Sequence, residues 1–152
     1  MGTRQLRTVE RSVLLPYSAK ALQALVNDVD CYSEFVPGCK SSSVIEEGND
    51  FVVARLELSG RGVSESLVTR NDQSESGIIV LSLVSGPFES FNGQWSFTDL
   101  GVGCRVGLEV SFRLKSLMID SLLWPFFGKI IDGLVDSFSK RARDLLMDED
   151  SN

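Results

Sequence analysis

Histidine is absent from this sequence of 152 residues, and its absence removes several kinds of chemistry. Without an imidazole there is no Ser/His or Cys/His relay and no metal site with a histidine ligand. No glycine-rich loop opens a helix directly after a strand, so the sequence does not predict a phosphate-binding loop for a nucleotide. We therefore expect no catalytic residues, no bound metal, no required cofactor and no enzymatic activity.

Cysteine is scarce as well, with only Cys31, Cys39 and Cys104. An odd number of cysteines without a CxxC spacing fits neither a disulfide framework nor a zinc knuckle. We expect all three to be free, buried thiols in a reducing compartment.

Positive charge is in the minority, because 15 Lys and Arg residues stand against 21 Asp and Glu residues, a net charge of −6. A surface of this balance repels a phosphate backbone, so DNA binding is not expected. The two ends differ in charge: Arg4, Arg7 and Arg11 make the beginning basic, whereas residues 147–152 form an acidic tail. We expect this tail to fray outside a folded core of about residues 7–146.

A long uncharged apolar run is also missing. The most apolar region, Leu117–Val135, is interrupted by Asp120, Lys129 and Asp132, which is too much charge for a membrane-spanning helix. The opening residues carry no apolar segment of the kind found in secretory signals. Since 43% of the residues are hydrophobic, one sizeable core is possible, and we expect a single cytoplasmic domain over residues 1–152.

Alternation of apolar and polar residues predicts strands. It is clearest over Cys104–Lys115, Phe91–Thr98 and Phe51–Ser59, where every second side chain is apolar. Weaker candidates are Thr8–Leu15, Lys40–Glu47, Gly62–Asn71 and Gly77–Val84. The links between strands after residue 40 are short and rich in glycine or polar residues, which favours antiparallel pairing.

Helical spacing appears at two places. Ser18 is a plausible N-cap for a short helix, and Asp30 for a second, shorter turn over Cys31–Phe35. A long amphipathic helix follows the last strand. Because Pro125 cannot donate a backbone hydrogen bond within a helix, we expect a kink or a fresh start there, with Leu117–Leu123 as a separate turn or two.

These elements predict an α+β fold. A strongly curved antiparallel β-sheet would wrap around the long C-terminal α-helix, with two short helices after the first strand. Within that sheet the stretch SGPFESFNGQWSF, Ser85–Phe97, is unusually aromatic. Gly93 lies between Phe91 and Trp95 on one face, where a missing side chain permits close approach. The sequence leaves two interpretations open, a cavity wall or an ordinary packed core.

Three segments carry a resemblance to a known family. Leu25–Glu46, Thr69–Asn71 and Val84–Phe97 resemble the RatA / coenzyme Q-binding protein family of the START-like (polyketide cyclase-like) superfamily. The resemblance extends from about Arg7 to Leu146 and implies the helix-grip fold. The sequence departs from the family at Ser33, where relatives usually carry proline, and in the unusually aromatic run 122–127.

The resemblance implies two different functions. Some members are regarded as ubiquinone carriers or chaperones that support respiration, whereas RatA is described as a toxin that binds the large ribosomal subunit and inhibits translation initiation. We expect the first function, with binding of ubiquinone or a related polyprenyl lipid and a transient contact with membrane surfaces. The ribosome-association toxin remains the alternative, and fold alone does not choose between them.

Each function has its own candidate residues. A quinone requires an apolar cavity with a few polar atoms, for which Trp95 and Tyr32 are candidate donors. The residues expected to line that cavity are Tyr32, Phe35, Phe91, Trp95, Phe97, Phe126, Phe127, Ile130, Ile131 and Leu134. Ribosome binding requires exposed cations, and the candidates are Arg61, Arg70, Lys140 and Arg141. Glu65 and Arg70 lie on a strand whose broken alternation does not assign them a face.

Overall fold

A computed structural model describes residues 5–150 of the chain, with side chains described through residue 146. Seven strands, two α-helices and one 3-10 helix follow one another along this part of the chain. In chain order they are β1 (Arg7–Leu15), α1 (Ala19–Asn27), η1 (Val29–Glu34), β2 (Cys39–Glu47), β3 (Phe51–Gly60), β4 (Val63–Asp72), β5 (Ile78–Ser85), β6 (Phe88–Asp99), β7 (Cys104–Leu114) and α2 (Leu117–Asp150).

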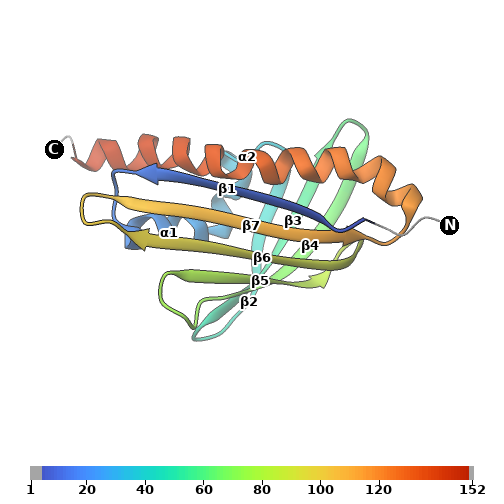
Figure 1. The fold of residues 1–152 in the computed structure, drawn as a ribbon, viewed down its shortest axis with the longest axis horizontal. Helices are drawn as coiled ribbons and strands as arrows, with labels where there is room; N and C mark the ends of the chain where they lie inside the picture. Colours follow the sequence, from blue (N-terminus) through green and yellow to red (C-terminus); the bar gives the residue numbers. More distant parts are fainter. Residues whose placement is uncertain (1–4, 151–152) are drawn as a thin grey trace.

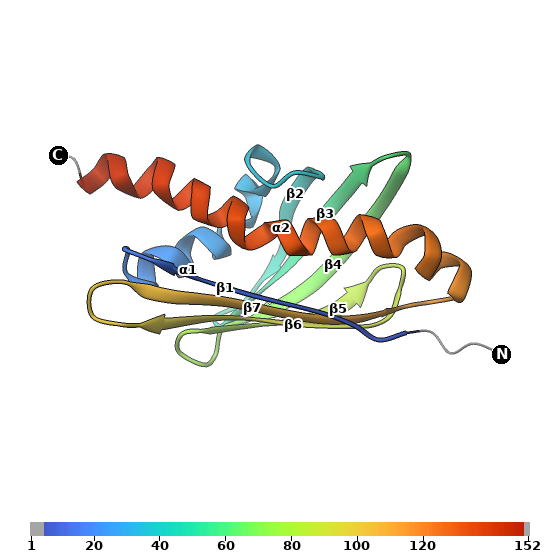
Figure 2. The same ribbon diagram turned by 45° about the horizontal axis from the view of Figure 1, so that its top comes forward.

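The strands form one antiparallel sheet in the order β1-β7-β6-β5-β4-β3-β2. Figures 1 and 2 show its strong curvature, since β1, β7 and β6 run along α2 while β2, β3 and β4 cross at a steep angle. The long helix lies over the inner face of this curved sheet (Figure 2). This arrangement confirms the predicted α+β helix-grip fold, with two short helices between the first two strands.

Contacts between α2 and the strands lie mainly on β1 and β7, at one edge of the sheet. The helix therefore covers one half of the inner face closely. The inner face of the other half, formed by β2 to β5, curves away from the helix (Figure 2). Only long side chains from α2 reach across that separation, so this half of the molecule is where a cavity can form.

The aromatic stretch lies in the core, as its alternation predicts. Phe91, Trp95 and Phe97 are buried on the inner face of β6, and Phe88 joins them. Strand β6 begins at Phe88, three residues earlier than the alternation predicts, while Gly86 and its following proline form the expected break from β5. The early start is explained by Phe88, whose buried ring packs on Phe112 and Phe127.

Gly93 has a packing role. It pairs with Leu81 of β5 and Val110 of β7 across the sheet. A Cβ built at Gly93 would lie 3.0 Å from Leu81 Cδ1 and 3.3 Å from Val110 Cγ2. The close approach that the sequence predicts at this glycine is therefore made by a neighbouring core side chain.

The two short helices begin in different ways. Ser18 caps α1 as predicted, because its Oγ accepts a hydrogen bond from the Ala21 backbone N–H at 3.1 Å. The prediction that Asp30 caps the second helix is wrong, since η1 begins at Val29 and has no side-chain cap. The Asp30 carboxylate instead accepts a hydrogen bond from the Val44 backbone N–H at 3.0 Å, which ties η1 to the edge strand β2.

Helix α2 departs from prediction at both ends. A separate helix before Pro125 is wrong, because the helix is continuous through the proline. Its first turns bend away from the rest of the axis (Figures 1 and 2), in keeping with the missing proline N–H. At the other end the helix includes residues 147–150, where we expected a separate acidic tail. Residues 151–152 of that tail and Arg4 lie outside the described part of the chain.

Two ion pairs join α2 to β1. Arg7 donates to Asp120 through Nε at 3.2 Å and through Nη2 at 2.6 Å, and both side chains are largely buried. The Arg7 guanidinium also lies 4.4 Å from the centroid of the Trp124 ring. Farther along the helix, Arg11 and Asp132 form a second pair at 2.8 Å that is about half exposed. The first pair fixes the bent beginning of α2 on the edge of the sheet.

Replacement of Asp120 by alanine tests this attachment. Asp120→Ala leaves the Arg7 guanidinium without its carboxylate, so we expect the free energy of unfolding to fall by about 2 kcal/mol, between the values for exposed and fully buried pairs. The matched control is Asp132→Ala, which removes the exposed pair and is expected to cost less than about 0.5 kcal/mol. Urea unfolding of both variants measures the difference. Equal losses would mean that the Arg7 pair contributes no more than a surface ion pair.

Candidate functional site: an apolar cavity between the sheet and the long helix

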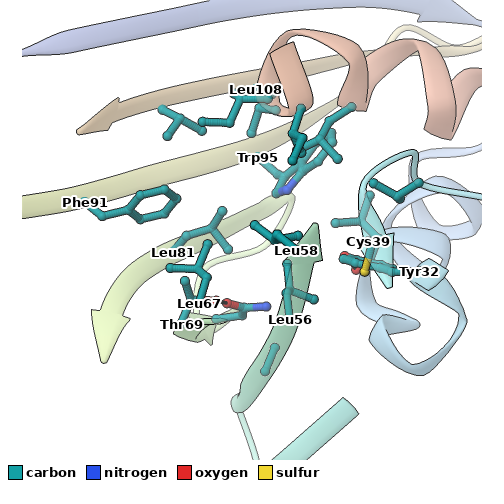
Figure 3. A pocket seen from close by; sticks show the side chains of 18 of the residues that line it. Tyr32, Cys39, Leu56, Leu58, Leu67, Thr69, Leu81, Phe91, Trp95 and Leu108 are labelled. Carbon is teal, nitrogen blue, oxygen red and sulfur yellow. Dashed lines mark hydrogen bonds between the residues drawn. The ribbon is translucent and has the colours of Figure 1, made fainter. Parts of the chain in front are cut away.

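A cavity of about 90 Å³ lies between α2 and the curved part of the sheet. Figure 3 shows Trp95 and Leu108 on one side of the space, Leu67 and Thr69 on the opposite side, and Tyr32 and Cys39 at one end. The lining residues come from α1, η1, α2, six of the seven strands and the link before β2: Val26, Tyr32, Val36, Cys39, Ala54, Leu56, Leu58, Leu67, Thr69, Asn71, Ile79, Leu81, Phe91, Trp95, Leu108, Val110, Phe127, Ile130, Ile131, Leu134 and Phe138.

The strand register places these side chains on the inner face. Ala54, Leu56 and Leu58 of β3 alternate with outward residues, and their partners on β4 include Leu67 and Thr69. From the other side α2 contributes side chains at helical spacing, among them Ile130, Leu134 and Phe138. The cavity is thus the space that remains where α2 and the curved strands are too far apart for full packing.

Seven of the ten residues predicted to line the cavity do so, namely Tyr32, Phe91, Trp95, Phe127, Ile130, Ile131 and Leu134. The other three have different places. Phe97 is buried beyond Trp95, with the two rings stacked at 6.3 Å. Phe126 packs on the Phe127 ring and approaches Gly60. Phe35 lies behind Tyr32 and Phe138, with its ring centroid 6.0 and 5.0 Å from theirs.

The alternation did not reveal two polar lining residues, Thr69 and Asn71 on β4. Both are buried, and the Thr69 hydroxyl donates a hydrogen bond to Asn71 Oδ1 at 2.7 Å. The pattern on β4 is hard to read from sequence because Val68, which faces outward, is also buried. A signal was present in the segment Thr69–Asn71, which carries part of the family resemblance.

Hydrogen-bond donors inside the cavity differ in whether they already have a partner. Of the two predicted donors, Tyr32 is already engaged, because its hydroxyl donates a hydrogen bond to the Val26 carbonyl. Trp95 is 3% exposed, and its indole nitrogen points into the enclosed space (Figure 3). No hydrogen bond from this N–H is found among the described residues, and it is not one of their fully enclosed polar atoms without a partner, so it is open to the cavity space. An unpaired buried donor costs about 1–3 kcal/mol, which makes this N–H a candidate ligand contact.

The cavity wall is electrically neutral. None of the described lining residues is Asp, Glu, Lys or Arg. Burial raises the pKa of the Tyr32 hydroxyl and of the Cys39 thiol, so both remain protonated at neutral pH. A charged ligand group placed here would meet no opposite charge and would lose its hydration. The site therefore favours neutral ligands.

Helix η1 forms one end of the site. The rings of Tyr32, Phe35 and Phe138 meet edge to face, and the Arg141 guanidinium lies 5.0 Å from the centroid of Phe35. Arg141 also approaches Glu34 at 3.6 Å. Cys31 on the same helix is partly exposed, which corrects the expectation that all three thiols are buried. Hydrogen bonds to Asp28 and Glu34 raise the pKa of Cys31 to about 11, so its thiol is unreactive at neutral pH.

The four cations proposed for ribosome binding do not share one surface. Arg70 lies on the outer face of the sheet, where its guanidinium stacks 3.7 Å from the centroid of Phe51. Lys140 and Arg141 lie on α2, which covers the opposite, inner face. Arg61 is exposed in the turn between β3 and β4, with a positive φ of 52°. The outward position of Arg70 also rules it out as an inward contact for a ligand head group.

Neither a metal site nor a membrane span is found in the described part of the chain. Among these residues, no three of Asp, Glu and Cys gather closely enough to hold a metal ion. No helix there has the length and apolar character needed to cross a bilayer.

The cavity and fold agree with a family match. The model of a family described as polyketide cyclase / dehydrase and lipid transport matches residues 15–139. The chain belongs to this family.

Similar proteins include several named for ribosome association and one named for coenzyme Q binding. A protein of Vibrio cholerae named "Ribosome association toxin RatA" is 37% identical over 139 residues, which cover 91% of this chain and 96% of the relative. The Pseudomonas aeruginosa protein of the same name is 37% identical, covering 90% and 96%. A "Coenzyme Q-binding protein COQ10, mitochondrial" of Dictyostelium discoideum is 26% identical, covering 94% and 72%. The resemblance to the RatA / coenzyme Q-binding proteins is therefore confirmed.

Solved structures of the polyketide cyclase / dehydrase and lipid transport type share the fold. The aromatase/cyclase Zhui from a Streptomyces species superposes with a TM-score of 0.76 at 18% identity, covering 91% of this chain and 95% of that one. An 18 kDa protein from Caulobacter crescentus superposes with a TM-score of 0.72 at 28% identity, covering 91% and 97%. The likeness to the cyclase shows the fold alone and transfers no activity.

Proposed function

We propose that this chain binds a neutral lipid-like ligand, a polyprenyl quinone or a related compound, and acts as its carrier or chaperone. The observation that supports this proposal is the uncharged, largely apolar cavity between α2 and the sheet. Burial of apolar ligand surface contributes about 25 cal/mol per Å², so such a wall favours an isoprenoid over water. Membership of a family described by lipid transport, and a relative named for coenzyme Q binding, agree with it.

The cavity must enlarge to hold such a ligand. At about 90 Å³ it is smaller than the roughly 300–1,000 Å³ typical of sites for drug-sized ligands. At the boundary between η1 and α2, the partly exposed pair Arg141–Glu34 at 3.6 Å adds little stability to the ring contacts there. We infer that the ligand enters as the C-terminal part of α2, around Phe138 and Arg141, moves away from η1.

Binding in this proposal needs no covalent chemistry. The only thiol in the wall, Cys39, is protonated because burial raises its pKa, and a thiol is a poor nucleophile. Thr69 donates its hydroxyl to Asn71 and has no general base beside it within the described cavity wall. The carrier would work from the cytoplasm and touch membranes transiently, for which Leu117, Met118 and Leu122 are exposed apolar candidates at the start of α2.

Filling the cavity tests the proposal. Ala54 is 2% exposed and faces the cavity from β3, so Ala54→Leu places a larger side chain in the empty space. We expect affinity for a short-chain ubiquinone to fall more than about tenfold, while the free energy of unfolding changes by less than about 1 kcal/mol. Quenching of the tryptophan fluorescence by the quinone measures binding, and urea unfolding measures stability.

The matched control is Ala24→Leu, the same substitution on the exposed surface of α1. This variant should bind the quinone as the unmodified chain does. Unchanged quinone affinity in Ala54→Leu, with the control also unchanged, would show that the quinone does not occupy this cavity.

A second candidate function is association with the large ribosomal subunit. It is supported by relatives at 30–37% identity that are named "Ribosome association toxin RatA". Since the four candidate cations are dispersed, the contact would use one of two surfaces: the outer face of the sheet with Arg70, or α2 with Lys140. Neither surface depends on the cavity.

Charge reversal separates the two surfaces. Arg70→Glu and Lys140→Glu exchange exposed cations for anions, and whichever residue contacts rRNA should lower cosedimentation with large subunits at least about tenfold at moderate salt. Quinone affinity should not change in either variant. If the unmodified chain does not cosediment with large subunits at low salt, ribosome association is excluded for this protein.

A further inference from the structure

The amide of Asn71 is a polar group in an otherwise apolar wall. Its residue is 8% exposed and faces the cavity from β4, where it pairs with Val52 of β3 on one side and Leu81 of β5 on the other. Buried amides in folded proteins nearly always have hydrogen-bond partners on both the carbonyl and the nitrogen side. The hydrogen bonds of the Asn71 amide therefore show which of its polar groups is left for a ligand.

Among the described residues, a hydrogen bond is found to the oxygen of the Asn71 amide. Oδ1 accepts the hydrogen bond from Thr69 Oγ1 at 2.7 Å. No hydrogen bond from Nδ2 is found among the described residues, and Nδ2 is not one of their fully enclosed atoms without a partner, so its N–H groups are open to the cavity space. Thr69 thus orients the amide, because its hydroxyl holds the oxygen and leaves the nitrogen directed elsewhere.

A second free donor lies across the same cavity. No hydrogen bond from the indole N–H of Trp95 is found among the described residues either, and Figure 3 shows Trp95 opposite Thr69. The two strands that carry these donors, β4 and β6, are separated by β5. The cavity therefore offers hydrogen-bond donors from two sides and, as shown above, no positive charge.

We propose that Asn71 Nδ2, oriented by Thr69, and Trp95 Nε1 donate hydrogen bonds to oxygen atoms of the ligand, and thereby select neutral ligands that carry carbonyl or ether acceptors. This inference rests on the proposed function and specifies its ligand class. Fatty acids and phospholipid head groups are excluded, because their anionic groups would be buried without a cation. Pure hydrocarbons fit the wall but leave both donors unpaired.

The test compares two probes that share the isoprenoid tail, one with oxygen acceptors on its ring and one without them. One is a ubiquinone with a short isoprenoid tail, and the other is an alkylbenzene that carries the same tail and no oxygen. Displacement of an apolar fluorescent dye from the cavity reports binding of both. For Asn71→Leu, which keeps a similar size and removes the donor, we expect about tenfold weaker quinone binding and unchanged or tighter binding of the alkylbenzene.

A matched control and a second donor variant accompany Asn71→Leu. Asn92→Leu is the matched control, because Asn92 is exposed on the outer face of β6, and it should change neither affinity. If Asn71→Leu does not fold, as judged by its thermal unfolding, Trp95→Phe removes the other donor and retains an aromatic ring. It should likewise weaken the quinone more than the alkylbenzene.

Failure of the proposed function and failure of the donor assignment give different results. If the unmodified chain binds neither probe, the proposed function is wrong and the donor assignment fails with it. If the unmodified chain binds both probes, but Asn71→Leu and Trp95→Phe bind the quinone as tightly as before, the cavity is a ligand site and the assignment of the donors is overturned.

Discussion

The placement of α2 on one edge of a strongly curved sheet is the constraint on which the rest of the structure depends. Its contacts are made mainly with β1 and β7, and the buried ion pair Arg7–Asp120 holds its bent beginning there. Because β2 to β5 curve away from that edge, the helix cannot pack closely on all seven strands (Figure 2). The cavity follows from this geometry, and the lining side chains determine only its size and polarity.

The polarity of the cavity wall indicates which kind of ligand the fold can bind. An apolar wall without charge and with two unpaired donors suits a ligand that is mostly hydrocarbon and bears neutral oxygen acceptors. The same fold appears in a cyclase structure at 18% identity, so the fold does not decide the function. In this wall the Cys39 thiol stays protonated at neutral pH, because burial raises its pKa.

Alternation and capping predicted most of the fold, because they are local. The face of Trp95 on β6 and the cap at Ser18 follow from a few neighbouring residues. The missed features depend on contacts between distant segments. Asp30 bonds to β2 instead of capping η1, and Leu81 fills the space at Gly93. Asn71 was missed because Val68, on the outer face of β4, is also buried, and the apolar and polar residues of β4 therefore do not alternate clearly.

The central claim is that the cavity of this chain holds a neutral lipid-like molecule. Native mass spectrometry of the chain purified from a quinone-producing bacterium, followed by organic extraction, tests it most directly. We expect a near-stoichiometric bound mass that is released as a neutral polyprenyl quinone or a related oxygen-bearing isoprenoid. An empty chain that also takes up no added quinone would contradict it, and the cavity would then be an incompletely packed core.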